Sequence, residues 1–347
     1  MDENEDVLVT AANGLGRITL NRPKAINSLT HPMVTAIAQT LRAWENDDSV
    51  TAVLVSGAGD RGLCAGGDVV AIYHDAKSGG TESRDFWHDE YLLNSYIGRY
   101  PKPYVALMNG ITMGGGVGIS AHGGVRVVTE TTKMAMPEVG IGFIPDVGGT
   151  FILSRTPGLL GVHAALTGAP FTGPDAIAMG FADHFVPQDR LAAFAEAVET
   201  DGIDAAVAAF AQEPPASPLM AQRGWIDHCY AGRTVDDIVS ALRSDDAAPA
   251  QDAADLIVSR SPIATSVTLE AVRRAAHLAT LEDVLRQEFR TSCAALRSHD
   301  LVEGIRALLI DKDRDPKWAP ASLSAVTADH IEAYFASADP DLQFEEN

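Results

Sequence analysis

Cysteine and positively charged side chains are both scarce in this chain of 347 residues. The three cysteines, Cys64, Cys229 and Cys293, lie far apart and have neither disulfide-framework nor metal-ligand spacing, which favours a reducing compartment. Lysine and arginine number 26 against 47 aspartate and glutamate, so the formal net charge is −21. This balance excludes a general binder of nucleic acid or of anionic membranes, because those partners attract cations. It leaves room for an anionic small molecule, which needs only local cations or backbone amides.

No apolar targeting segment is visible at the start of the chain, since residues 1–6 are acidic. Together with the cysteine pattern, this leads us to expect a cytoplasmic protein. The uncharged stretch 104–121 approaches the length of a membrane span, but it is rich in glycine and contains Asn109, Thr112 and Ser120. We therefore expect a buried strand followed by a glycine-rich loop, and no membrane partner.

The first half of the chain alternates strand-like and helix-like segments. Strands are predicted at 16–20, 51–55, 104–108 and 125–128, and helices at 30–44 and 86–99. Thr30 is the expected N-cap of the first helix, with Pro32 in its first turn. Strands that alternate with helices predict an α/β fold.

The second half changes character, because alanine becomes frequent and helical patterns dominate from about residue 189. Segments 213–218 and 244–255 have the composition of connections, and 262–310 is expected to be a helical unit. We divide the chain into a core at 1–190 and a mainly helical C-terminal region at 191–347.

Three glycine-rich loops stand out, at 57–67, 110–118 and 137–149. The first contains a GxGxxG pattern, but no helix opens within its glycines, so it does not indicate a dinucleotide site. Glycine lets a backbone N–H approach a ligand closely, and amides from two loops can form an oxyanion hole for a thioester or ester carbonyl. The alternative for any single loop is a tight turn without function.

Two acidic residues lie in apolar, glycine-rich surroundings. Glu138 follows Pro137 and Asp146 follows Pro145, a setting that desolvates carboxylates and suits them to act as base, nucleophile or acid. The alternative for Asp146 is a helix N-cap before residues 147–153. Cys64 has no histidine nearby in sequence to activate it and is expected to be a small buried residue.

The histidines show no metal-ligand spacing, so no metal is expected. The only local cluster with acids, His88-Asp-Glu90, has the composition of a solvated helix start.

Residues 63–68 (LCAGGD), 102–118 (KPYVALMNGITMGGGVG) and 136–149 (MPEVGIGFIPDVGG) resemble the enoyl-CoA hydratase/isomerase (crotonase) superfamily. Segments 261–269 and 300–318 resemble its 3-hydroxyisobutyryl-CoA hydrolase subfamily. The resemblance extends over about residues 8–325. It implies a crotonase-like spiral of β-β-α units with a C-terminal helical region, and a CoA thioester as substrate without a further cofactor.

The resemblance also implies roles for individual residues. The oxyanion hole maps onto the amides of Gly67 and Gly115, the catalytic glutamate onto Glu138, its partner carboxylate onto Asp146, and a substrate-contacting acid onto Glu90. Gly115, Glu138 and Asp146 would also bind the substrate. The CoA-contacting positions map onto Arg22, Lys24, Ala25, Ala65, Gly67 and Asp68.

One sequence position distinguishes the hydratases from the hydrolases of this superfamily. Hydratases of the superfamily carry a second glutamate three residues after the oxyanion-hole glycine, and here that position is Gly118. The resemblance therefore implies hydrolysis of a short hydroxyacyl-CoA, such as 3-hydroxyisobutyryl-CoA in valine breakdown. An enoyl-CoA hydratase or isomerase, and a non-catalytic acyl-CoA-binding protein, remain the alternatives. A homo-oligomer is compatible with the family, and no nucleic-acid partner is expected.

Overall fold

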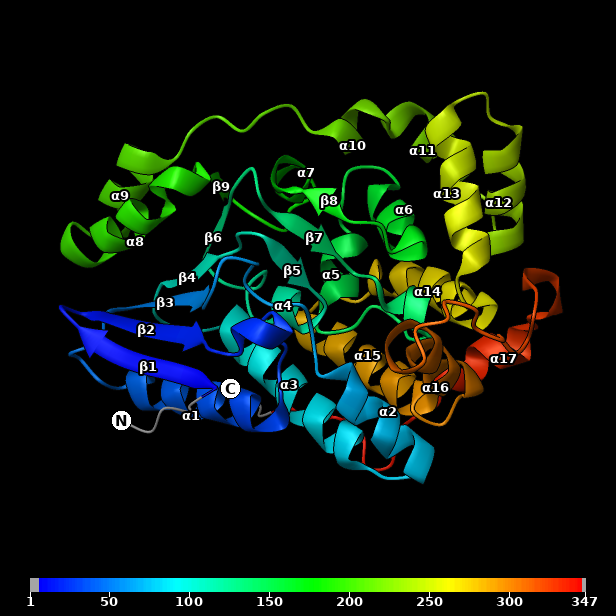
Figure 1. Ribbon diagram of the computed structural model, residues 1–347, viewed down its shortest axis with the longest axis horizontal. Helices are drawn as coiled ribbons and strands as arrows, with labels where there is room; N and C mark the ends of the chain where they lie inside the picture. The colour runs from blue at the N-terminus through cyan, green and yellow to red at the C-terminus, as the bar shows by residue number, and fades with distance from the viewer. Residues whose placement is uncertain (1–5, 345–347) are drawn as a thin grey trace. The chain divides into compact units, whose positions relative to one another are not determined.

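A computed structural model describes residues 6–344, shown in Figure 1. The chain divides into two compact units. The sheet unit consists of Met1–Gly67, Leu92–Met134 and Phe171–Pro218. The helical unit consists of Asp68–Tyr91, Ala135–Pro170 and Leu219–Asn347. The domain boundary placed at residue 190 from the sequence stays a prediction.

The sheet unit is built on a six-stranded sheet in the order β1-β2-β3-β4-β6-β9 (Figure 1). These strands are β1 (Val7–Ala12), β2 (Leu15–Leu20), β3 (Ala52–Gly57), β4 (Tyr104–Leu107), β6 (Val125–Val128) and β9 (His184–Phe185). From β2 onward neighbouring strands are parallel, which requires the intervening helices and confirms the α/β class. All four predicted strands are present.

The edge strand β1 pairs antiparallel with β2 and was not predicted. Asn13 and Gly14 both have positive φ, at 51° and 84°, between the two strands. An Asn-Gly pair with two positive φ values is the preferred two-residue hairpin connection. Through this turn β1 pairs antiparallel with β2, whereas β2, β3, β4, β6 and β9 are parallel to their neighbours in this order.

The two helices predicted in the first half are confirmed as α1 (His31–Glu45) and α3 (Glu82–Gly98). The Thr30 side chain caps α1 by accepting a hydrogen bond from the Met33 amide, as expected. A further helix, α2 (Val69–Ser78), was missed and begins after Asp68, whose side chain accepts from the Ala71 amide.

The core of the sheet unit lies between the sheet and two helices, α8 (Leu191–Thr200) and α9 (Ile203–Phe210). Leu54, Val105 and Val127 from three adjacent strands belong to one buried apolar cluster with Phe194 of α8. Such near-continuous apolar strands are typical of parallel sheets.

A second sheet of three short strands follows the order β5-β7-β8. Its strands are β5 (Ile111–Met113), β7 (Lys133–Ala135) and β8 (Phe171–Thr172), and α7 (Gly173–Ala178) follows them. The expected loop at 110–118 is therefore partly wrong, because it holds β5 and the short helix α4 (Gly115–Gly118). Among residues 6–344 no helix has the length and apolar character needed to cross a bilayer.

The second half of the chain is mostly helical, as predicted, and its residues from Leu219 onward belong to the helical unit. Its helices are α2, α5 (Gly149–Leu153), α6 (Leu160–Thr167), α11 (Arg223–Cys229), α12 (Val235–Ser244), α13 (Ala248–Ser259), α14 (Pro262–Ala275), α15 (Leu281–Ala295), α16 (His299–Ile305) and α17 (Ala328–Glu332), while α10 (Pro218–Ala221) lies at its border. The helical reading of 262–310 is confirmed. The connection expected at 244–255 is wrong, because α13 begins there and buries Ala250, Ala254 and Ile257.

Candidate active site

Three carboxylates named from the sequence lie buried in the helical unit. Glu90 is on α3, Glu138 begins a 3-10 turn (Glu138–Ile141), and Asp146 precedes α5. Their exposures are only 2%, 6% and 5%. The solvated helix start expected around Glu90 is therefore wrong for this side chain, because α3 is turned so that Glu90 faces the protein interior.

The three carboxylates interact electrostatically, and burial dominates their behaviour. Burial and the nearby Asp146 charge raise the pKa of Glu90 and of Glu138 well above the ordinary glutamate value. Burial also raises the pKa of Asp146 to about 7, although a hydrogen bond from Tyr91 lowers it. Carboxyls whose pKa is moved toward neutrality by desolvation and by like charge can give and take protons near pH 7.

Two oxygen atoms of this cluster have no hydrogen-bond partner. They are Glu138 Oε2 and Glu90 Oε1, and both are fully buried. A buried polar atom without a partner is costly, so such atoms in a folded protein call for an explanation. A substrate group or a nucleophilic water molecule at these oxygens would remove that cost.

The Asp146 side chain is held by a chain of hydroxyl groups. The Tyr91 hydroxyl donates to Asp146 Oδ2 at 2.6 Å and lies 2.7 Å from Ser292 Oγ on α15. The N-cap alternative for Asp146 is wrong, because α5 begins at Gly149 after Gly148 and has no side-chain cap. The carboxylate has instead turned to Tyr91, while only its backbone carbonyl accepts from the Gly149 amide.

A fourth buried carboxylate, Glu288 of α15, was missed in the sequence. It accepts hydrogen bonds from the Gly148 amide at 2.6 Å, the Thr150 amide at 3.0 Å and the Thr150 hydroxyl at 2.6 Å. Burial raises its pKa to about 8 against the opposing effect of these bonds. The available signal was its spacing, because Glu288 and Ser292 interrupt the apolar face that contains Leu285 and Leu296.

Aromatic side chains line the same part of the helical unit. Trp87 and Phe143 stack with ring centroids 5.1 Å apart, and Phe289 meets the Tyr91 ring edge-on at 6.3 Å. Trp87 and Phe289 are almost entirely buried. Desolvation is also the largest cause of every raised carboxyl pKa in the cluster.

The predicted oxyanion-hole glycines belong to the sheet unit, where their two loops lie against each other. The Cys64 amide donates to the Ile111 carbonyl, and the Met113 amide donates to the Cys64 carbonyl. Gly115 is the first residue of α4, a position whose N–H has no acceptor within the helix. The neighbouring segment reaches Gly115 closely, since a Cβ built on Gly66 would lie 3.8 Å from the Gly115 nitrogen.

Cys64 lies between these loops, as a small buried residue. It is fully buried, and its Sγ accepts from the Gly66 amide at 3.4 Å. Gly116 packs on it so tightly that an added Cβ would lie 2.5 Å from the Cys64 carbonyl oxygen. The expectation that Cys64 is structural is confirmed.

The predicted CoA-contacting loop at 22–26 is followed by Asn27, which ties it to the loop at 58–65. Asn27 is fully buried, accepts from the Arg22 amide, and donates to the carbonyls of Ala58 and Gly62. The Ala65 amide donates to the Ile26 carbonyl at 2.9 Å. The structure thus brings together the segments that contain Ala25 and Ala65, while CoA contact itself stays a prediction.

The two cations predicted for CoA differ in their surroundings. The Arg22 guanidinium donates to the Ser28 carbonyl at 2.7 Å and so helps hold its own loop. Lys24 is exposed and its carbonyl accepts from Arg61 at 3.4 Å. Asp68, the last predicted contact, caps α2 and belongs to the helical unit.

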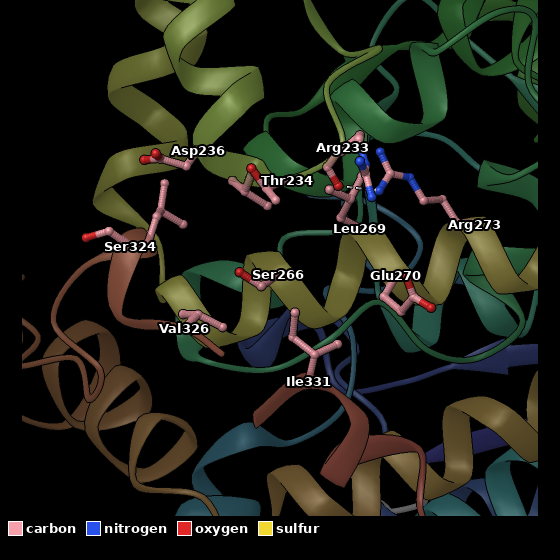
Figure 2. Close-up of a pocket in the computed structure, with 12 residues that line it drawn as sticks. Arg233, Thr234, Asp236, Ser266, Leu269, Glu270, Arg273, Ser324, Val326 and Ile331 are labelled. Atoms are coloured by element: carbon pink, nitrogen blue, oxygen red, sulfur yellow. Dashed lines mark hydrogen bonds between the residues drawn. The ribbon is translucent and has the colours of Figure 1, made fainter. Parts of the chain in front are cut away.

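A separate cavity of about 310 Å³ lies in the helical unit, away from the residues named above (Figure 2). Arg233 and Arg273 stand at one end of it, and Arg273 donates to the Arg233 carbonyl. Glu270, Leu269 and Ile331 are also among its lining residues. Within residues 6–344 no three His, Cys, Asp or Glu side chains converge to hold a metal ion.

Comparison with known proteins places the chain in a family. The family model described as enoyl-CoA hydratase/isomerase matches residues 15–335. The chain belongs to the enoyl-CoA hydratase/isomerase family. The 3-hydroxyisobutyryl-CoA hydrolase, mitochondrial, of Danio rerio is 41% identical over 96% of this chain and 90% of its own length. The resemblance seen in the motifs is thereby confirmed, and it continues through the C-terminal region.

Solved structures of this family support the fold. A carnitinyl-CoA dehydratase from Mycobacterium thermoresistibile is 70% identical, with a TM-score of 0.97 over 99% of this chain and 100% of its own. An enoyl-CoA hydratase from Rhodobacter sphaeroides is 39% identical, with a TM-score of 0.92 over 98% of this chain and 100% of its own. The predicted crotonase-like architecture with a C-terminal helical region is confirmed.

Proposed function

We propose that the chain hydrolyses a short 3-hydroxyacyl-CoA thioester, with 3-hydroxyisobutyryl-CoA as substrate and 3-hydroxyisobutyrate and free CoA as products. The observation that carries the proposal is the buried pair Glu138 and Asp146, whose charges interact while Glu138 Oε2 has no partner. The near full-length similarity to 3-hydroxyisobutyryl-CoA hydrolases supports the substrate.

The proposed chemistry divides the work between backbone amides and carboxylates. The amides of Gly67 and Gly115 stabilise the charge that develops on the thioester oxygen, where one donor is typically worth about 3 kcal/mol. Glu138 either attacks the carbonyl or takes a proton from the attacking water. The C–S bond then breaks, and the CoA thiolate leaves and is protonated. Where Glu138 is the nucleophile, water next hydrolyses the acyl-Glu138 anhydride, which releases the acid and regenerates the carboxylate.

Asp146 and Glu90 have supporting roles in this proposal. Asp146 orients the attacking water or the substrate hydroxyl, and its place beside Tyr91 fixes the direction of its oxygens. Glu90, with Oε1 unpaired, binds the substrate hydroxyl. The scheme needs no cofactor besides the CoA of the substrate.

The names of the structural relatives suggest a second function, hydration or dehydration of an acyl-CoA double bond. In hydratases of this superfamily the second glutamate stands three residues after the oxyanion-hole glycine. Gly118 occupies that position here, is fully buried within α4, and supplies no carboxylate. Gly118 therefore favours hydrolysis of the thioester over addition of water to a double bond.

We further propose that the protein acts in the cytoplasm in valine breakdown. The three cysteines are buried and none forms a disulfide, which suits a reducing compartment. The curated hydrolases are named mitochondrial, so the compartment is the part of the proposal that differs from them.

A thiol-release assay tests the function directly. The panel contains 3-hydroxyisobutyryl-CoA, 3-hydroxypropionyl-CoA, isobutyryl-CoA and crotonyl-CoA, with free thiol and double-bond absorbance both recorded. We expect thiol release to be fastest with 3-hydroxyisobutyryl-CoA, and the one-methyl difference from 3-hydroxypropionyl-CoA to matter by about 10–200-fold. Loss of the crotonyl double bond without thiol release would establish the hydratase alternative instead.

A further inference from the structure

Helix α15 contacts the segment around Asp146 at two separate points. Glu288 binds the backbone directly after Asp146, through the amides of Gly148 and Thr150. Ser292 lies one helical turn later and bonds Tyr91, which in turn bonds the Asp146 side chain. Residues four apart share one face of a helix, so a single face of α15 reaches both the backbone and the carboxylate of this segment.

The segment that α15 holds is in a demanding backbone conformation. Val147 has a φ of 53° and is almost entirely buried. A β-branched residue rarely adopts positive φ, and such a conformation persists only where surrounding contacts impose it. Gly148 follows with a φ of 76°, so two successive residues after Asp146 are left-handed.

The Glu288 contacts are suited to impose that conformation. Oε2 accepts from the Gly148 amide and Oε1 accepts from both the amide and the hydroxyl of Thr150. Amides at the start of a helix have no acceptor inside it, and here Glu288 supplies acceptors for two of them. The carboxylate thus bridges the turn whose geometry directs Asp146.

The Ser292 contact acts on the side chain of Asp146 rather than on the backbone turn that follows it. Tyr91 has a single hydroxyl proton, which it donates to Asp146, so the Ser292 hydroxyl donates to the Tyr91 oxygen. All three groups are buried, and Ser292 is fully so. The direction of the Tyr91 hydroxyl is therefore set by α15.

We propose that Glu288 and Ser292 are positioning residues for Asp146, acting as a two-point support from α15 that fixes the backbone turn and the carboxylate. The inference rests on the proposed hydrolase function for its kinetic consequence. Its structural consequence, an ordered turn at 146–150, is independent of any activity.

The test compares Glu288→Gln and Ser292→Ala with Gln287→Met as a matched control. Gln287 is buried on the same helix, but its side chain donates to the Ala271 carbonyl of α14. We expect the Glu288→Gln enzyme to lose kcat on the order of 100-fold with little change in KM, because misplacing a reacting group costs about that much. We expect a smaller kcat loss for Ser292→Ala, together with a shift to higher pH of the kcat/KM limb controlled by Asp146. The Gln287→Met control should retain kcat within about threefold, even where it loses as much thermal stability as the Glu288→Gln variant.

Hydrogen exchange of the peptide covering 146–150 gives a readout besides activity. We expect faster exchange in Glu288→Gln than in the native chain, and no change in Gln287→Met. Wild-type kcat and exchange in a folded Glu288→Gln protein would overturn the proposal, as would equal kcat losses in the variant and the control. If Glu288→Gln does not fold, an unchanged kcat and pH profile in Ser292→Ala would overturn it. If the native chain released thiol from no acyl-CoA, the hydrolase function would be refuted. The exchange result would still decide whether Glu288 orders the turn at 146–150.

Discussion

The Tyr91 hydroxyl donates a 2.6 Å hydrogen bond to Asp146 Oδ2, in a region where both side chains are buried. This bond favours the ionised aspartate and so lowers the pKa of Asp146, whereas burial raises that pKa to about 7. Burial, the larger influence, and the Tyr91 phenol group thus act in opposite directions on the pKa of Asp146. A single substitution at Tyr91 should therefore change the pH dependence of the enzyme.

Replacing Tyr91 with phenylalanine removes that hydrogen bond and keeps the ring. The pKa of Asp146 should rise, because only the charged form gains from the bond. If ionised Asp146 is required, the acidic limb of the kcat/KM profile should move to higher pH. A profile measured from pH 5 to 9 with 3-hydroxyisobutyryl-CoA checks this, and an unmoved or acid-shifted limb would contradict it.

Asp146→Asn should abolish most activity and yet stabilise the protein at alkaline pH. Burial raises the pKa of Asp146 in the folded state from 3.8 to about 7. Its contribution to stability is therefore fully present below about pH 4 and is lost as pH rises through 7. At ~1.4 kcal/mol per pKa unit, the variant should gain a few kcal/mol over the native chain at pH 8. Urea unfolding at pH 4.5 and pH 8 measures this, and a difference independent of pH would refute the reasoning.

Gly116→Ala tests the close packing of the two glycine loops. The added Cβ would lie 2.5 Å from the Cys64 carbonyl oxygen, so the backbone beside Gly115 must move. We expect activity to fall on the order of 100-fold, with a drop in the melting temperature. Gly124→Ala is the control, because a Cβ there meets nothing within 4 Å. Equal effects of the two substitutions would show that loop geometry is not the cause.

Asn27→Ala should weaken binding of the CoA thioester more than it slows the chemical step. The Asn27 side chain accepts a hydrogen bond from the Arg22 amide of its own loop and makes two that tie this loop to the next, by donating to the carbonyls of Ala58 and Gly62. Its loss leaves buried groups unpaired, at a cost of about 1–3 kcal/mol in the free energy of unfolding. We expect KM for the CoA thioester to rise more than kcat falls. A pure kcat loss with unchanged KM would place this loop outside CoA binding.

The sequence predicted the parallel strands β2, β3, β4 and β6 and the helix α1, because their signals are local, whereas the two-residue parallel strand β9 was missed. Apolar runs such as 104–108 and the Thr30 cap depend on a few neighbouring residues. The hairpin at Asn13-Gly14 was equally local and was overlooked. The connection expected at 244–255 failed because small alanines in α13 pack as a core face, which composition alone does not reveal.

The candidate site was only partly predictable. Local composition singled out Glu138 and Asp146, and motif resemblance added Glu90. The structure places all three in one buried cluster. Glu288 and Ser292 were missed because their partners lie far away in the sequence. The N-cap alternative for Asp146 failed because the side chain binds Tyr91, a donor that also lies far away in the sequence.

The central claim is that Glu138 carries out thioester hydrolysis in this chain. The most direct measurement is free CoA released from 3-hydroxyisobutyryl-CoA by the native protein and by Glu138→Gln, which keeps the side-chain shape. The account predicts steady release by the native protein and a loss of at least about 1000-fold in the variant, with folding intact. Thiol release by Glu138→Gln at the native rate would contradict it.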